Sequence, residues 1–126
     1  MKMILMVALG GAIGSSSRYL VGVAATRLFG IGFPWGTLIV NIVGSFLMGV
    51  LVAALALRYS VSNEVRAFLA IGVLGGFTTF SSFTLDAVSL YEKKQYLATM
   101  SYMGGSVILS LLAMFLGLAV IRAIAA

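Results

Sequence analysis

Six polar side chains recur at a spacing of four residues within two long apolar stretches of this sequence. They are Thr37, Asn41 and Ser45 in the first stretch, and Tyr102, Ser106 and Ser110 in the second. Residues four apart lie on the same face of an α-helix. We therefore expect two polar stripes, each running along one helix. Every member can donate a hydrogen bond and none is an acid, so the stripes suit a small anion.

A third candidate is the segment 72–83, in which glycines are followed by hydroxyls interleaved with phenylalanines. Phe80 and Phe83 are three residues apart, and a phenyl ring has a negative face and a positive edge. Ring edges and neutral donors together can replace the water around an anion without trapping it beside a fixed charge, which conduction requires. From the residues alone, core packing of the rings and helix–helix bonding by Asn41 remain alternatives.

Composition restricts the classes of protein to which the chain can belong. Its 126 residues are 62% hydrophobic and only 9% charged, whereas a soluble domain has about 25% charged residues. We therefore expect an integral membrane protein, with the lipid bilayer as its partner. The chain has no histidine, no cysteine and only three acids, so the usual metal ligands and catalytic acids or bases are scarce. Neither an enzyme nor, without a basic run, a nucleic-acid-binding protein is expected.

Four apolar segments can be drawn, and each reaches the roughly 20 residues that a spanning helix needs. They cover residues 3–28, 34–57, 65–91 and 96–124. The connections between them are short, and they leave no room for a soluble domain. The prediction is an all-α membrane protein, in which residues 1–126 form one four-helix transmembrane domain.

The third segment is a poor continuous helix, because Gly72, Gly75 and Gly76 cluster before the hydroxyls. We expect it to be broken at Gly75–Thr79. A break at membrane depth is tolerated only where protein or a water-filled cavity covers it, and transporters and channels place ion sites there. In the first segment, Gly10 and Gly14 are four apart, and they predict close packing against a neighbouring helix.

Arg18 lies within the first apolar segment. A charge at such a depth costs ~3 kcal/mol on insertion scales. Two interpretations remain open: the long side chain extends to one membrane interface, or it attracts anions at the mouth of a pathway.

The basic residues are almost evenly divided between the two predicted membrane faces. Lys2, Arg58, Arg66 and Arg122 fall on one side, and Arg27, Lys93 and Lys94 fall on the other. The positive-inside rule therefore hardly selects an orientation. A chain so balanced can insert both ways, and four helices are few to enclose a path. We expect a dimer, with an antiparallel two-fold pair as the hypothesis.

Three stretches together resemble the Fluc/CrcB family of bacterial fluoride channels. They are GGAIGSSSRY at 10–19, WGTLIVNIVGS at 35–45 and GGFTTFSSF at 75–83, and the similarity extends over essentially the full chain. The resemblance implies an antiparallel, dual-topology homodimer with two fluoride pores. It also implies a location in the bacterial cytoplasmic (inner) membrane, and passive export of fluoride from the cytoplasm that lowers its toxicity.

The resemblance also implies roles for individual residues. Phe80 and Phe83 would present ring edges to fluoride. The other residues implied along the pore are Asn41, Ser81, Thr37, Tyr102, Ser106 and Ser110. Gly75 and Thr78 would give backbone carbonyls to a structural sodium ion that is not transported, and Arg18 would lie near a vestibule. Where some members have a glutamate, this chain has Asp86, which leaves the role of that acid open.

Two other functions are considered. A small multidrug-type antiporter is similar in size and in dual topology, but it needs a membrane-embedded glutamate in its first helix. This chain has no acid before Glu64. A non-conducting accessory subunit is the third possibility, and flux measurements on liposomes would distinguish it.

Overall fold

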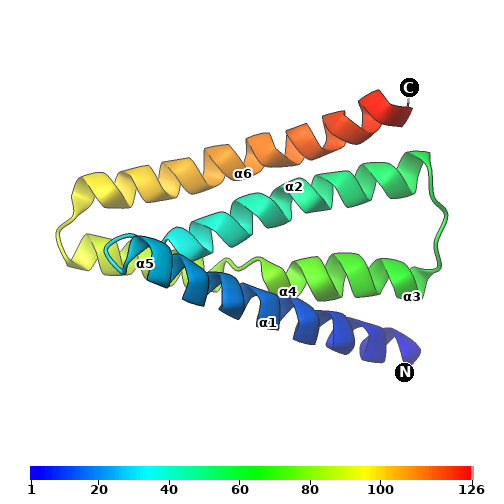
Figure 1. Ribbon diagram of the computed structural model, residues 1–126, viewed down its shortest axis with the longest axis horizontal. Coiled ribbons are helices and arrows are strands. Elements are labelled where there is room, and N and C mark those ends of the chain that lie inside the picture. The colour runs from blue at the N-terminus through cyan, green and yellow to red at the C-terminus, as the bar shows by residue number, and fades with distance from the viewer. Residues whose placement is uncertain (126) are drawn as a thin grey trace.

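The computed structural model describes residues 1–125, and in them four helical segments are long and apolar enough to cross a membrane (Figure 1). Ala126, the last residue of the predicted domain, lies outside the described residues. The spans are Lys2–Phe29, Trp35–Leu57, Asn63–Glu92 and Tyr96–Ala125. The first, second and fourth are the helices α1, α2 and α6. The all-helical, four-span architecture predicted from the sequence is confirmed, with bounds that differ by one or two residues.

The third span consists of several pieces. It begins with α3 (Asn63–Arg66) and η1 (Ala67–Leu74), continues as α4 (Gly75–Phe77), and resumes as α5 (Ser81–Glu92). The element η1 has the wider turn of a π-helix, in which the amide of Gly75 reaches back to the carbonyl of Ala70. Such turns are rare, and they are frequently found at functional sites.

The predicted break in the third span is confirmed, but its position differs. The expected break was Gly75–Thr79, whereas Gly75–Phe77 is helical and the non-helical residues are 78–80. The helical ladder continues because the Thr78 amide donates to the Leu74 carbonyl across 3.1 Å. Gly76 is needed for packing and not for the break, because a Cβ added to it would lie 3.0 Å from the Gly11 carbonyl oxygen.

The helices associate as two close pairs. In Figure 1, α1 crosses the first half of the third span, while α2 runs beside α6. A Cβ on Gly10 would meet the Phe68 carbonyl oxygen, and one on Gly14 would meet the backbone at Val73. Both glycines are buried, so the predicted close packing of α1 is confirmed. Small residues permit such approach in membranes, where apolar burial does not drive helices together.

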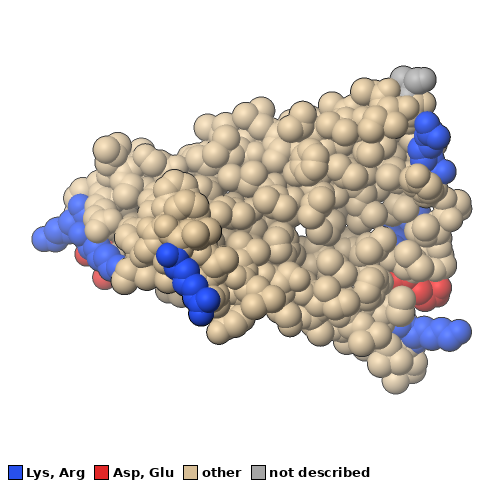
Figure 2. All heavy atoms as spheres, in the orientation of Figure 1, with Lys and Arg blue, Asp and Glu red and all other residues tan. Residues whose placement is uncertain are grey.

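Charged side chains lie mostly toward the two ends of the molecule, with an uncharged band between them (Figure 2). The chain begins and α6 ends on the same side of the bundle (Figure 1). The ends of the helices therefore place Lys2, Arg58 and Arg122 at one end, and Arg27 and Lys93 at the other. This arrangement agrees with the near-balance of charge read from the sequence.

Candidate ion site at the helix break

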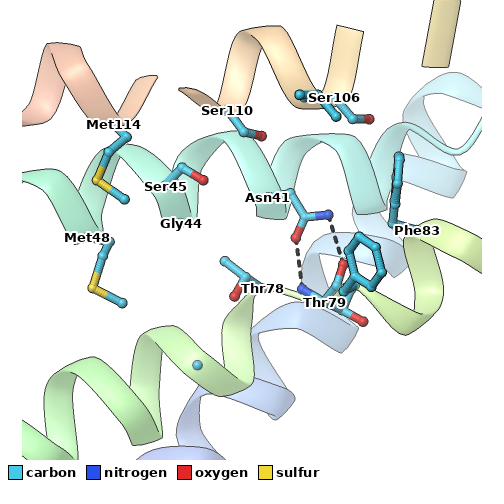
Figure 3. Close-up of a pocket in the computed structure, with 13 residues that line it drawn as sticks. Asn41, Gly44, Ser45, Met48, Thr78, Thr79, Phe83, Ser106, Ser110 and Met114 are labelled. Atoms are coloured by element: carbon cyan, nitrogen blue, oxygen red, sulfur yellow. Dashed lines mark hydrogen bonds between the residues drawn. The ribbon is translucent and has the colours of Figure 1, made fainter. Parts of the chain in front are cut away.

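The side-chain amide of Asn41 on α2 forms two hydrogen bonds with the backbone of Thr79 in the break (Figure 3). Its Oδ1 accepts from the Thr79 amide across 2.8 Å, and its Nδ2 donates to the Thr79 carbonyl across 3.0 Å. A backbone amide and carbonyl without partners are costly in a membrane. One asparagine side chain therefore satisfies both groups at the centre of the break.

Two backbone amides are diverted from their usual helical acceptors in this region. In a continuous helix the Thr79 amide would bond to the Gly75 carbonyl, and the Ser82 amide to the Thr78 carbonyl. Here the Thr79 amide bonds to Asn41, and the Ser82 amide donates to Thr79 Oγ1 across 3.1 Å. The Gly75 and Thr78 carbonyls thus lose the partners that a helix would give them.

Thr78 contacts both η1 and α2. Its hydroxyl donates to the Leu74 carbonyl across 3.0 Å, and its backbone is extended, with φ −89° and ψ 160°. Its methyl group packs on Gly44 of α2, where any added Cβ would collide with it. The hydroxyl is thus bonded within its own span, and the Ser82 amide, which would be the helical partner of the Thr78 carbonyl, donates elsewhere.

Arg18 extends from α1 to the same break. Its Nε donates to the Gly76 carbonyl across 3.1 Å, and its side chain is half-buried. A cation at the C-terminal end of a helix is favourable, because the last carbonyls carry partial negative charge. In this structure the guanidinium is therefore bonded to the backbone of the third span. Arg18 also lines a cavity of about 720 Å³ together with Thr79 and Ser82.

A second cavity, of about 510 Å³, is bounded by the break, α2 and α6 (Figure 3). The residues that line it are Asn41, Gly44, Ser45, Met48, Gly75, Thr78, Thr79, Phe80, Phe83, Ser106, Val107, Ser110 and Met114. All of them are uncharged, and hydroxyls, an amide and phenyl rings supply the polar contacts. The two polar stripes of α2 and α6 thus meet across one space, together with the aromatic residues.

Ser106 is the most deeply buried hydroxyl on this cavity. It is 5% exposed, and its Oγ is the one buried side-chain polar atom among the described residues that has no hydrogen-bond partner. Buried polar atoms are normally paired, and an exception needs an explanation. A hydroxyl that lines a cavity with an unused donor is suited to an anion.

The two predicted phenylalanines lie at the end of this cavity. The Phe80 and Phe83 ring centroids are 5.7 Å apart, and Phe83 also packs against Tyr102 at 5.3 Å. Phe83 is half-buried, whereas Phe80 is 76% exposed within the single chain. One ring is therefore fixed by its neighbours, and the other is free to contact a further element.

The similarity of this chain to known proteins agrees with the geometry. The family model "CrcB-like protein, Camphor Resistance (CrcB)" matches residues 5–118. The chain belongs to the CrcB family. Relatives named "Fluoride-specific ion channel FluC" include one from Agrobacterium fabrum, 59% identical over 94% of this chain and 95% of the relative. A relative of the same name from Chelativorans sp. is 54% identical over 96% of this chain and 97% of its own length. One from Cereibacter sphaeroides is 56% identical over 94% of this chain and 94% of its own length.

Membership of the CrcB family has two direct consequences. The relatives are named as ion channels, so this chain is not expected to catalyse a reaction. Together with the four candidate spans, the family indicates a multi-pass membrane protein.

Not every residue predicted for the CrcB pore lines the neutral cavity. Thr37 lines the cavity of Arg18 instead. Tyr102 is fully buried, and its hydroxyl donates to Asp86 Oδ2 across 3.1 Å. Ser81 is exposed, with its Oγ 3.4 Å from Thr79 Oγ1. These three, like Arg18, are not among the residues that line the cavity shared by the other pore residues.

Sequence reasoning gave no role to Gly44, Met48 and Met114 of the site, and it named Thr79 only as the end of the expected break. Met114 is the next residue of the α6 stripe, four after Ser110, so the same periodicity could have identified it. For Thr79 the signal was weaker. The backbone of a break needs both a donor and an acceptor, and an asparagine side chain supplies both. Asn41 is the one asparagine within the predicted spanning helices before the break.

The residues at the break of this CrcB protein fit a small hard cation. Among the described residues, no group of three or more His, Cys, Asp or Glu side chains could hold a metal ion. The Gly75 and Thr78 carbonyls, however, are released from helical bonding. Oxygen ligands suit hard cations, and the carbonyls of unwound membrane helices coordinate Na⁺ in transporters.

Proposed function

We propose that this chain is a fluoride-selective ion channel of the bacterial cytoplasmic membrane, and that it exports fluoride passively from the cytoplasm. The observation that carries the proposal is the neutral cavity with the unpartnered Ser106 hydroxyl. The names of its relatives, which cover nearly the full chain, support the choice of ion. A passive mode is supported by the lining of the cavity, which consists of uncharged residues.

Fluoride would exchange its water for fixed neutral donors in this cavity. Ser106 and Ser110 supply hydroxyls from α6. Asn41 still has one Nδ2 proton to offer, because only the other is used by the Thr79 carbonyl. The positive edges of Phe80 and Phe83 add a weak attraction. With no fixed positive charge on the lining, the ion would bind without being trapped.

We further propose that two chains associate as an antiparallel homodimer with two pores. Phe80 is largely exposed in the single chain, and Gly75 is exposed beside it. A second copy of the same segment would cover both. The near-equal basic charge at the two ends is what dual topology requires.

The dimer would also complete a sodium site. Gly75 and Thr78 would each give one carbonyl, and the two-fold related residues would provide the other pair. The ion would supply positive charge that holds four carbonyl dipoles together at the centre of the dimer. Because it is held by backbone atoms of both chains, it would be structural and not transported.

The experiment that tests the channel proposal is fluoride efflux from proteoliposomes, measured with a fluoride electrode after potassium permeability is provided. Protein-containing vesicles should release fluoride rapidly, whereas protein-free vesicles should not. Chloride-loaded vesicles are the control for selectivity. Folded protein that passes no fluoride, or passes both halides equally, would overturn the proposal.

Orientation can be tested independently. The chain has no cysteine, so a single cysteine introduced near Lys94, in the loop before α6, reports one membrane side without background. Labelling of whole cells by an impermeant maleimide should modify about half of the molecules. Complete labelling, or none, would contradict dual topology.

A further inference from the structure

One backbone amide at the break has two competing acceptors. The Thr79 N–H can donate to the Gly75 carbonyl, as in a continuous helix, or to Oδ1 of Asn41, as it does here across 2.8 Å. It cannot serve both with good geometry. The choice of acceptor therefore decides whether the Gly75 carbonyl is available to a ligand.

We propose that Asn41 is a positioning residue that keeps the third span broken: by taking the Thr79 amide, it releases the Gly75 carbonyl toward the sodium ion. This inference rests on the sodium site of the proposed function and adds the side chain that opens it. In this role Asn41 acts on the cation through the backbone.

The geometry around Asn41 supports a fixed position. Both ends of its amide are engaged with the same residue, Thr79, so the side chain cannot rotate without losing two bonds. One turn further along α2, Gly44 accommodates the Thr78 methyl group. These two contacts attach consecutive residues of the break to α2. The group that keeps the Thr79 amide from the Gly75 carbonyl is therefore on α2 and not on the third span.

The same side chain also lines the neutral cavity. Asn41 consequently lies between the proposed anion path and the proposed cation site, and it contributes to each through different atoms. Its Oδ1 acts on the backbone, whereas the second Nδ2 proton remains for the cavity. Loss of Asn41 should therefore weaken sodium binding even where fluoride is absent.

The first experiment measures sodium binding without fluoride, as the sodium-dependent rise in the unfolding temperature of the purified protein. Asn41→Ala allows the Thr79 amide to return to Gly75, so sodium must compete with a backbone hydrogen bond. We expect about tenfold more sodium to be needed for the same rise. Asn63→Ala is the matched control, because Asn63 is exposed at the start of α3 and far from the break.

A second substitution tests the mechanism by rescue. Proline at position 79 has no N–H, and its ring clashes with the carbonyl four residues earlier, so the helix cannot re-form toward Gly75. Thr78 is already extended, as a residue before proline prefers. The double variant Asn41→Ala/Thr79→Pro should recover a sodium response close to that of the unchanged chain. Asn41→Ala/Thr79→Ala keeps the amide and should not recover it.

The outcomes separate this inference from the proposed function. If sodium stabilises the unchanged chain and Asn41→Ala responds to the same concentrations, the positioning role of Asn41 is wrong and the sodium site stands. If sodium has no effect on the unchanged chain, the sodium site itself is overturned, while fluoride efflux still tests the channel. If Asn41→Ala does not fold, the single variant Thr79→Pro tests whether the sodium response needs the Thr79 amide to stay away from the Gly75 carbonyl. That variant should keep its sodium response, and a lost response would contradict the proposal.

Discussion

The hydroxyl of Tyr102 on α6 donates a hydrogen bond to Oδ2 of Asp86 on α5 across 3.1 Å. Tyr102 is fully buried, and its ring lies between Phe83 and Phe33, with the Phe33 ring edge-on at 5.5 Å. The pair joins the segment that follows the break to a helix that is continuous. Because the Tyr102 ring also packs on Phe83, the pair supports the position of the Phe83 ring.

Removing the acceptor of this bond should destabilise the protein. Asp86→Ala removes the acceptor of the proton of the fully buried Tyr102 hydroxyl, which should cost about 2 kcal/mol. Adding Tyr102→Phe removes the stranded hydroxyl, so the double variant should be less destabilised than the sum of the single variants. Thermal unfolding in detergent measures all four proteins of this cycle. Strictly additive effects would mean that the two side chains do not interact in the assembled protein.

Replacing the two phenylalanines tests whether their rings serve the anion. Phe80→Ile and Phe83→Ile keep apolar bulk but remove the positive ring edge. With a contribution of about 1 kcal/mol for one such aromatic contact, fluoride efflux should fall by about fivefold or more in each variant. Phe115→Ile is the control, because Phe115 is an exposed phenylalanine of α6 outside the cavity. Unchanged efflux in both test variants would show that the rings only pack.

Adjacent glycines of α1 provide a matched test of helix packing. A Cβ on Gly10 would collide with the Phe68 carbonyl and lie 2.8 Å from the Gly72 Cα, whereas one on Gly11 would meet nothing within 4 Å. Gly10→Ala should destabilise the protein by about 2 kcal/mol, because backbone cannot move aside easily. Gly11→Ala should be neutral or slightly stabilising, since alanine favours a helix by about 1 kcal/mol. Equal unfolding temperatures for the two variants would contradict the close contact of α1 with η1.

The sequence was sufficient for features that depend on local composition. Runs of apolar residues predicted the four spans, and the spacing of Gly10 and Gly14 predicted the packing of α1. The presence of a break also followed from local signals. Its position did not, because Gly75 and Gly76 continue the helix, and Gly76 lies against the backbone of Gly11 in α1.

The remaining features depend on how the helices are rotated against one another. A stripe with a period of four shows that Tyr102 and Ser106 share a face, but not which neighbour each one meets. Asp86 draws Tyr102 away from the cavity that Ser106 lines. Likewise, the pairing of Asn41 with Thr79 joins residues 38 apart in the chain, and no local pattern specifies such a contact.

Ser106→Ala should reduce fluoride conduction without reducing the stability of the protein. The Ser106 Oγ is buried without a partner, so its removal ends a desolvation penalty and should leave stability unchanged or raise it by about 1 kcal/mol. Fluoride efflux should fall, because the cavity loses its most buried donor. Ser101→Ala, at an exposed serine five residues earlier on α6, should alter neither quantity. A clear loss of stability in Ser106→Ala would show instead that this hydroxyl is bonded within the protein, and that the anion path does not use it.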